Sequence, residues 1–228
     1  MEKKILVWDL PLRIFHWGFV ISIVGAWITH ELGEDYISLH MQFGYVALGL
    51  VSFRLIWGVI GPHYSQFKTF FPSPKLIHRY IKSKKEDGNN AILGHNPLGS
   101  LSVFAMLVLV LIQSVSGLFM NDEIFTTAPY HNSLGSDVDK IMNFIHKNAF
   151  DIIQLLILLH IGAIIYYKIF KKQALASSMF TGKKIGNEKS LSIKSSKIVL
   201  AIIVAIIVTA FIYWLVVLNV PEVDDFYY

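Results

Sequence analysis

The chain has 228 residues, of which 54% are hydrophobic and 16% charged, and it carries a formal net charge of +4. A soluble globular domain has about 25% charged residues, so this composition argues against a water-soluble domain and indicates an all-α polytopic membrane protein. The absence of cysteine excludes disulfides, iron–sulfur clusters, thiolate zinc sites and covalently attached c-type haem, so a redox metal has to be held by His or Met.

Five apolar stretches are long enough to cross a bilayer as helices. The first contains Trp17 and Trp27 and lacks a small-residue cleavage site, so we expect it to stay in the membrane rather than to be removed as a signal peptide. We predict one transmembrane domain over residues 1–228, with spans at about residues 11–31, 39–60, 97–120, 145–170 and 197–220.

The basic residues between the spans fall on alternate sides of the membrane. The N-terminal residues and the connections 61–96 and 168–197 are rich in Lys and Arg, whereas the other side has only Lys140 and Lys147 and many acidic residues. By the positive-inside rule, this pattern predicts a cytoplasmic N-terminus and an extracytoplasmic C-terminus. Because the positive charges flank the spans, they indicate a membrane surface and not nucleic-acid binding.

The first span carries ionisable side chains, which are costly inside a bilayer and therefore indicate function. His16 lies inside the cytoplasmic end, and Arg13, three residues earlier, is on nearly the same helical face. His30 follows His16 by 14 residues on the same face, in a polar interfacial stretch. We interpret His30 as hydrogen-bonded to water, with a metal-ligand role as the alternative.

The second span opens with His40 at the outer face. Gly44, one helical turn later, leaves space beside that histidine. Arg54 is 14 residues after His40, so it faces the same way near the cytoplasmic end of the span.

The connection 61–96 contains several Gly and Pro turn signals. Within it, residues 75–84 are consistent either with a short amphipathic helix on the lipid headgroups or with a solvated basic loop. His95 lies in a Gly-His-Asn-Pro turn directly before the third span. We interpret it as hydrogen-bonded to the loop backbone, and the alternative is proton delivery to a quinone.

The outer loop, residues 121–144, is acidic and turn-prone, and the fourth span after it contains His146 and His160. These two histidines are 14 residues apart, so they share one helical face at depths about 21 Å apart. This geometry suits two stacked haems on one helix of a bundle. The partners at matching depths are His16 for His160 and His40 for His146. Two bis-histidine sites follow, and their filled axial positions favour electron transfer over catalysis at the iron.

Other residues of the first two spans suit these sites. Gly44 removes a side chain that would collide with the porphyrin edge, so we prefer His40 as the outer ligand, although His30 could replace it. Arg13 and Arg54 suit the haem propionates, and their alternative role is contact with lipid phosphates. The fifth span contains no His and cannot ligate a haem, so we expect it to anchor the chain or to pack against a partner.

Several motifs taken together resemble the prokaryotic di-haem cytochrome b family, typified by the membrane subunit of nickel–iron hydrogenases. The resemblance covers about residues 5–184 and leaves the fifth span unmatched. It rests on His146 with His160 and on the runs VWDLPLRIFHW (residues 7–17), LHMQFGY (39–45), RLIWGVIGP (54–62), GHNPLG (94–99) and MFTGK (179–183). It implies a four-helix core in a prokaryotic cytoplasmic membrane, with two b-type haems on His16, His40, His146 and His160.

The resemblance also implies electron exchange between the membrane quinone pool and an extracytoplasmic partner, a hydrogenase or a c-type cytochrome. We therefore expect an electron-transfer subunit in contact with lipid, quinone and that partner; homodimer formation and the direction of electron flow stay open. One alternative is a stand-alone quinone reductase that oxidises superoxide, which the acidic outer face disfavours. Another is a haem-free proton-relay transporter, which the scarcity of acids within the spans disfavours.

Overall fold

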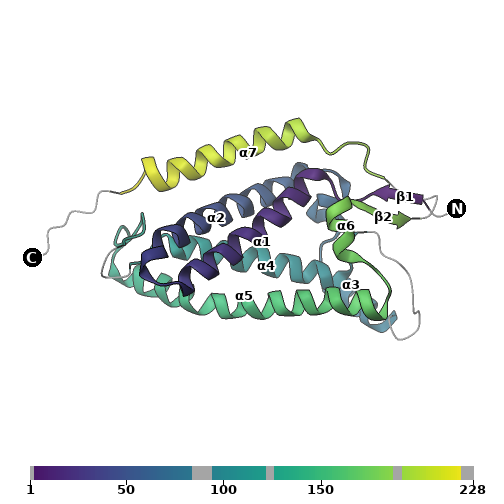
Figure 1. The fold of residues 1–228 in the computed structure, drawn as a ribbon, viewed down its shortest axis with the longest axis horizontal. Coiled ribbons are helices and arrows are strands. Elements are labelled where there is room, and N and C mark those ends of the chain that lie inside the picture. Colours follow the sequence, from purple (N-terminus) through teal and green to yellow (C-terminus); the bar gives the residue numbers. More distant parts are fainter. Residues whose placement is uncertain (1–2, 84–93, 122–125, 187–191, 222–228) are drawn as a thin grey trace, which may run out of the picture. The chain divides into compact units, whose positions relative to one another are not determined.

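The computed structural model describes residues 3–83, 94–121, 126–186 and 192–221 (Figure 1). Five helices within these residues are long and apolar enough to cross a membrane. They are α1 (Leu10–Glu31), α2 (Ile37–Ile60), α4 (Pro97–Gly117), α5 (Ser136–Phe170) and α7 (Ile198–Tyr213), which the π-helical turn η4 (Trp214–Leu218) extends. The predicted all-α polytopic fold is confirmed.

Shorter elements connect these helices. The 3-10 turn η1 (Glu34–Tyr36) leads into α2, and η2 (His63–Ser65), η3 (Phe67–Thr69) and α3 (Pro74–Ser83) lie between α2 and α4. The helix α3 is the amphipathic helix predicted for residues 75–84, so of the two alternatives the helix is confirmed. The short helix α6 (Leu175–Thr181) follows α5.

The fourth span begins earlier than predicted. Helix α5 starts at Ser136 and has 35 residues, so the expected loop 121–144 is wrong from residue 136 onward. Asp137 and Asp139, which look like loop residues in the sequence, lie in the first helical turn. Carboxylates there are stabilised by the helix dipole, which explains why the helix includes them. The preceding Gly135 has a φ of 91°, which suits the sharp entry of the chain into the helix.

The described residues group into two compact units, and each long helix contributes to both. The first unit comprises Met1–His16, Arg54–Met106 and Leu155–Ile202, and the second comprises Trp17–Phe53, Leu107–Gln154 and Ile203–Tyr228. Large apolar side chains are exposed along all five spans; on α5, for example, Leu158 is 67% exposed. Such surfaces suit contact with lipid tails rather than with water.

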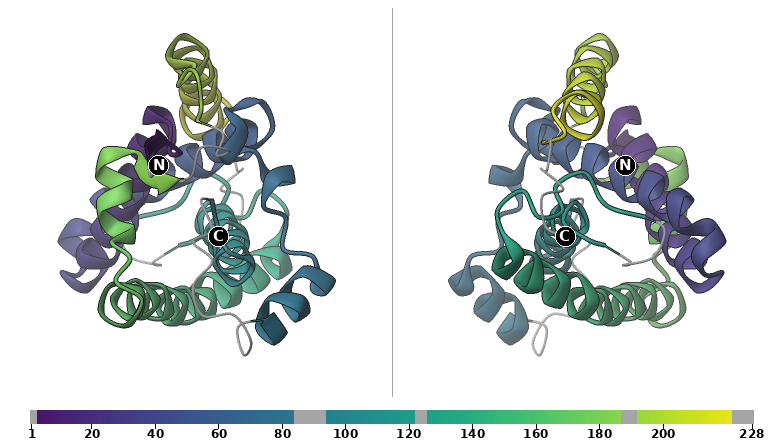
Figure 2. Two further views of the ribbon diagram at one scale, coloured as in Figure 1. Left: turned by 90° about the vertical axis from the view of Figure 1, so that its right-hand side faces the viewer. Right: turned by 90° about the vertical axis from the view of Figure 1, so that its left-hand side faces the viewer.

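A two-stranded antiparallel sheet, absent from the sequence prediction, lies in the first unit. Strands β1 (Lys3–Leu6) and β2 (Lys183–Gly186) pair with Leu6 opposite Lys183 (Figure 1). The carbonyl of Gly182 accepts hydrogen bonds from the backbone N–H groups of Val7 (2.9 Å) and Trp8 (3.0 Å). Helix α6, in light green, lies beside the start of α1 in the left view of Figure 2. The sheet and α6 therefore tie the chain after the fourth span to the N-terminal segment.

The fifth span packs on the second span in the second unit. A Cβ atom built at Gly49 of α2 would lie 3.6 Å from Ile212 and 3.9 Å from Val208 of α7, so the two helices are in close contact at this glycine. The hydroxyl of Tyr130 donates to the carbonyl of Leu215 at 3.0 Å in the π-helical turn. Helix α7 is thus held by contacts within its own chain.

Candidate functional site

Three histidines meet in the second unit. The ring centroids of His40 on α2 and His146 on α5 are 6.2 Å apart, with the planes nearly perpendicular at 85°. The ring of His30, near the end of α1, lies 5.6 Å from that of His40. The structure therefore brings together the predicted outer pair, His40 and His146, and also places the alternative ligand His30 beside them.

Backbone carbonyls orient His40 and His146. The Nδ1 of His40 donates to the carbonyl of Ala26 at 2.8 Å, and the Nδ1 of His146 donates to the carbonyl of Gln113 at 2.9 Å. A carbonyl can only accept, so each neutral ring carries its proton on Nδ1 and keeps the lone pair on Nε2. Metal-ligating histidines are held in this way, with the second nitrogen bonded to a carbonyl or carboxylate. His30, in contrast, is exposed.

Two glycines make room around this pair. A Cβ atom at Gly117 of α4 would lie 2.9 Å from Cε1 of His146, so only a glycine leaves the imidazole in its place. A Cβ atom at Gly44 of α2, four residues after His40, would meet nothing within 4 Å. Gly117 was not singled out in the sequence, because its role depends on the approach of α4 to α5.

The outer pair fits a haem iron. A metal about 2 Å from one nitrogen of each of two opposed imidazoles places the ring centroids roughly 6 Å apart, close to the 6.2 Å between His40 and His146. In both rings the lone pair of Nε2 is available to a metal, and neutral imidazole nitrogens are common ligands of haem iron. The residues present therefore suit a b-type haem held by two histidines.

A second set of histidines lies in the first unit. His16 of α1 is close enough to His160 of α5 for the two imidazoles to repel each other when charged. His95 interacts electrostatically with both of them. The ring of His95 lies 4.8 Å from that of Trp8 and 4.5 Å from that of Phe70, between centroids. The structure thus brings the predicted inner pair together and adds His95 beside it.

The environment of His95 keeps its imidazole neutral. Burial, and after it the positive charges of Arg54 and Lys184, lower the pKa of His95 to about 3. Burial also lowers the pKa of Lys184 to about 8; its ammonium donates to the carbonyl of Gly94 at 3.3 Å. The Nδ1 of His95 is buried and has no hydrogen-bond partner among the described residues, so the expected bond from this nitrogen to the loop backbone is absent.

Arg54 is buried beside an acid that the sequence reasoning overlooked. The side chain of Arg54 is 2% exposed, its guanidinium lies 4.4 Å above the ring of Phe67, and the negative charge of Asp9 attracts it. Asp9 is fully buried. Its Oδ1 accepts from the backbone N–H of Leu12 at 2.9 Å and from the indole of Trp57 at 3.1 Å, and its Oδ2 accepts from the hydroxyl of Ser65. An Asp directly before the first residue of α1 is an N-cap signal that could have identified it.

The two arginines suggested for the propionates keep unused donors. Arg13 donates from Nη1 to the carbonyl of Phe180, in the last turn of α6. Its Nε, and Nη1 of Arg54, are buried and make no hydrogen bond within the described part of the chain. A buried guanidinium N–H without a partner is costly, so each of these atoms suits an anionic group bound nearby.

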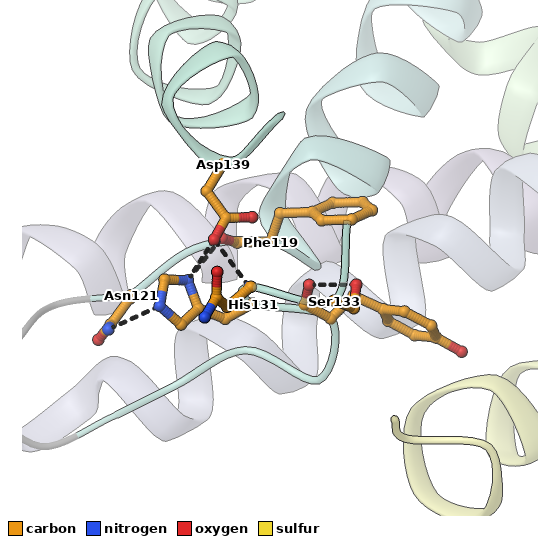
Figure 3. Close-up of polar contacts among 7 residues, drawn as sticks. Phe119, Asn121, His131, Ser133 and Asp139 are labelled. Carbon is orange, nitrogen blue, oxygen red and sulfur yellow. Dashed lines mark hydrogen bonds and ion pairs between the residues drawn. The ribbon is translucent and has the colours of Figure 1, made fainter. Parts of the chain in front are cut away.

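His131, expected only as an outer-loop residue, fastens that loop to the start of α5. Its Nδ1 lies 3.0 Å from Oδ2 of Asp139, and its Nε2 lies 3.2 Å from the amide nitrogen of Asn121. The same carboxylate oxygen accepts from the backbone N–H of Asn132 at 2.7 Å (Figure 3). This cluster holds the loop in place and contains none of the four candidate ligands.

Comparison with known proteins identifies the family. A family model described as prokaryotic cytochrome b561 matches residues 7–182. The chain is similar to the probable Ni/Fe-hydrogenase B-type cytochrome subunit of Azotobacter vinelandii, with 24% identity over 79% of this chain and 88% of the relative. A protein of the same description from Bradyrhizobium diazoefficiens is 22% identical over 80% of this chain and 87% of its own length. No solved structure matches the chain.

The family match begins just before α1 and ends after α6, so it contains all the histidines described above. It stops before α7, which contains no histidine. Taken with the five apolar helices, it places the chain in the prokaryotic cytochrome b561 family, as a multi-pass transmembrane b-type cytochrome of electron transfer.

Proposed function

We propose that this chain binds two b-type haems, one between His40 and His146 and one between His16 and His160. The observation that carries the proposal is the outer pair. The centroids of its two imidazoles are 6.2 Å apart, and the Nδ1 of each ring is hydrogen-bonded to a backbone carbonyl. The inner pair is supported by the proximity of His16 and His160. His16 lies 14 residues before His30 on α1, and His160 lies 14 residues after His146 on α5.

The protein residues hold the cofactors and limit their chemistry. When bound, haem supplies one-electron oxidation and reduction. The carbonyls of Ala26 and Gln113 fix the tautomer and the plane of the outer ligands, which raises their basicity. With two histidines as its ligands, the iron would have no position left for oxygen or a substrate. The unused N–H groups of Arg13 and Arg54 are the donors for the propionates of the inner haem.

The proposed electron path joins a hydrogenase to the quinone pool. The similar proteins from Azotobacter and Bradyrhizobium are described as cytochrome subunits of Ni/Fe-hydrogenases, which supports a hydrogenase as the extracytoplasmic partner of this chain. A c-type cytochrome in its place would use the same two haems. The distribution of Lys and Arg supports a cytoplasmic N-terminus, which puts the His40–His146 pair on the side of that partner. Quinone then exchanges electrons near the inner pair.

Ligand replacement with haem counting tests this assignment. The purified protein should contain two low-spin b haems per chain in a dithionite-reduced minus air-oxidised spectrum. His146→Ala and His160→Ala should each remove one haem, and the two variants should lose different spectral components. His30→Ala is the matched control, because this residue lies beside the outer pair but is exposed. Loss of the outer haem in His30→Ala with its retention in His40→Ala would assign the ligand to His30 instead.

Turnover measurements separate the proposed subunit from a stand-alone reductase. The purified chain alone should not reduce quinone with a small diffusible donor such as superoxide, and quinone reduction should require the partner. Rapid turnover without a partner would support the stand-alone enzyme, and a haem-free protein after expression with sufficient haem would contradict both.

A further inference from the structure

The segment that joins α2 to α4 carries positive charge next to exposed apolar side chains. Residues 61–83 contain Lys68, Lys75, Arg79 and Lys82 and no Asp or Glu. Phe71 is 62% exposed and Leu76 is 48% exposed. The segment begins directly after α2 ends at Ile60, and α4 begins at Pro97, so both neighbouring elements are membrane spans. A basic amphipathic segment attached to two spans is placed at the level of the lipid headgroups.

A cavity of about 410 Å³ opens within this segment. Its apolar walls come from the aromatic and aliphatic side chains of the segment and from the start of α4, and its cations are Lys68 of η3 and Arg79 of α3. The complete lining is Lys68, Thr69, Phe70, Phe71, Leu76, Arg79, Tyr80, His95, Pro97 and Ser100. A volume of this size is in the range of small-molecule sites, and the lining combines an apolar wall with two positive charges.

Most of the polar groups in the cavity wall are already paired. The hydroxyl of Thr69 donates to the carbonyl of Gln66 at 2.7 Å, and that of Ser100 donates to the carbonyl of Asn96 at 3.0 Å. The hydroxyl of Tyr80 lies 3.1 Å from that of Tyr167. Positive charge and one imidazole nitrogen stay available for a ligand. In the described residues neither Lys68 nor Arg79 forms an ion pair, and the buried Nδ1 of His95 has no hydrogen-bond partner.

We propose that this cavity binds the phosphate headgroup of an anionic phospholipid. Lys68 and Arg79 hold the phosphate, His95 is part of the cavity wall, and the exposed Phe71 and Leu76 contact the start of the acyl chains. The charge complementarity favours a phosphate ligand, and the exposed apolar side chains beside the cations favour a lipid over a free anion. This lipid site is independent of the number of haems and of their ligands.

The proposal is tested by counting retained lipid in matched variants. The haem-loaded full chain is purified in neutral detergent and titrated with phosphatidylglycerol or phosphatidylcholine, and native mass spectrometry gives the bound lipid per chain and its affinity. One phosphatidylglycerol should bind in preference to phosphatidylcholine. Lys68→Gln with Arg79→Gln should weaken this binding roughly 30-fold, since each cation near an anionic lipid contributes at this scale.

The control variant combines Lys75→Gln with Lys82→Gln, which removes the same charge from α3 at positions that do not line the cavity. It should weaken phosphatidylglycerol binding clearly less than Lys68→Gln with Arg79→Gln does, because neither side chain lines the cavity. Equal losses of phosphatidylglycerol affinity in the two double variants would show that the lipid is attracted by the overall positive charge of the segment, which would overturn the proposed site. Competition by inorganic phosphate at equal concentration would assign the cavity to a soluble anion, and displacement by a quinone without any effect of phosphatidylglycerol would assign it to quinone. The haem spectrum of each variant shows whether the protein is still folded.

Discussion

Individual residues explain why the candidate ligands are held as they are. The sequence pairs His40 with His146 by depth, because each lies near the same end of its span, and the 14-residue spacing puts His146 and His160 on one face of α5. The groups that orient them could not be predicted, since the carbonyls of Ala26 and Gln113 carry no side-chain signal. Asp9 was overlooked for a different reason: its partners Trp57 and Ser65 are about 50 residues away in the sequence, and only the folded chain brings them together.

Gly117→Ala tests whether the His146 ring needs the space that this glycine leaves. The added methyl group would lie 2.9 Å from Cε1 of the imidazole, so the ring has to shift, which disturbs its hydrogen bond to the carbonyl of Gln113. We expect loss or a marked spectral change of one haem, with the other unaffected. Gly49→Ala is the control, since its Cβ would make ordinary contacts of 3.6 Å or more. An unchanged haem spectrum in Gly117→Ala would contradict the role of His146 as a ligand in this orientation.

His95 makes stability depend on pH. Its pKa is about 3 in the folded protein and about 6.5 in the unfolded chain, so the unfolded chain binds the extra proton as pH falls below 6.5. The contribution of neutral, buried His95 to the free energy of unfolding is therefore complete above pH 6.5 and is lost as the pH falls from 6.5 toward 3. Between pH 7.5 and pH 5 this histidine should cost up to about 2 kcal/mol of unfolding free energy. Denaturant unfolding of wild type and His95→Gln at both pH values measures the difference, and parallel pH dependences would refute it.

At the level of elements, hydropathy is sufficient to predict which segments form the spans, but not where every span begins. Four spans begin within a few residues of the prediction, because an apolar run of about 20 residues is an unambiguous signal. The start of α5 is the exception, since Asp137 and Asp139 can end a loop or begin a helix. The strands β1 and β2 have four residues each, too few for an alternating pattern to be visible, and they form only because residues 3–6 meet residues 183–186.

Gly182→Ala tests the junction between α6 and the N-terminal segment. Gly182 has a φ of 77°, and a Cβ there would lie 2.7 Å from the carbonyl oxygen of Trp8. We expect a destabilisation of more than about 1 kcal/mol from backbone strain and steric contact together. Gly135→Ala isolates the backbone contribution, because its φ of 91° is also positive but its Cβ would meet nothing within 4 Å. Equal shifts in melting temperature for both variants would exclude a steric contribution at Gly182.

The whole molecule is organised by charge as well as by hydropathy. The described basic connection between α2 and α4 and the acidic first turn of α5 belong to opposite sides in the topology predicted by the positive-inside rule. Because the chain contains no cysteine, single cysteines can report this topology without background. Lys140→Cys should react with a membrane-impermeant maleimide in intact cells, and Lys75→Cys only after permeabilisation. The reverse labelling pattern would invert the topology and with it the side assigned to each histidine pair.

Helix α5 sets a fixed distance between its acidic first turn and His146. Its 35 residues extend about 52 Å, whereas roughly 20 residues suffice to cross the hydrocarbon core of a bilayer. Asp137 in the first turn and His146 belong to the same helix, nine residues or about 14 Å apart along its axis. If the proposed redox partner docks on this acidic first turn, its distance from His146 stays constant, because a continuous helix connects the two points.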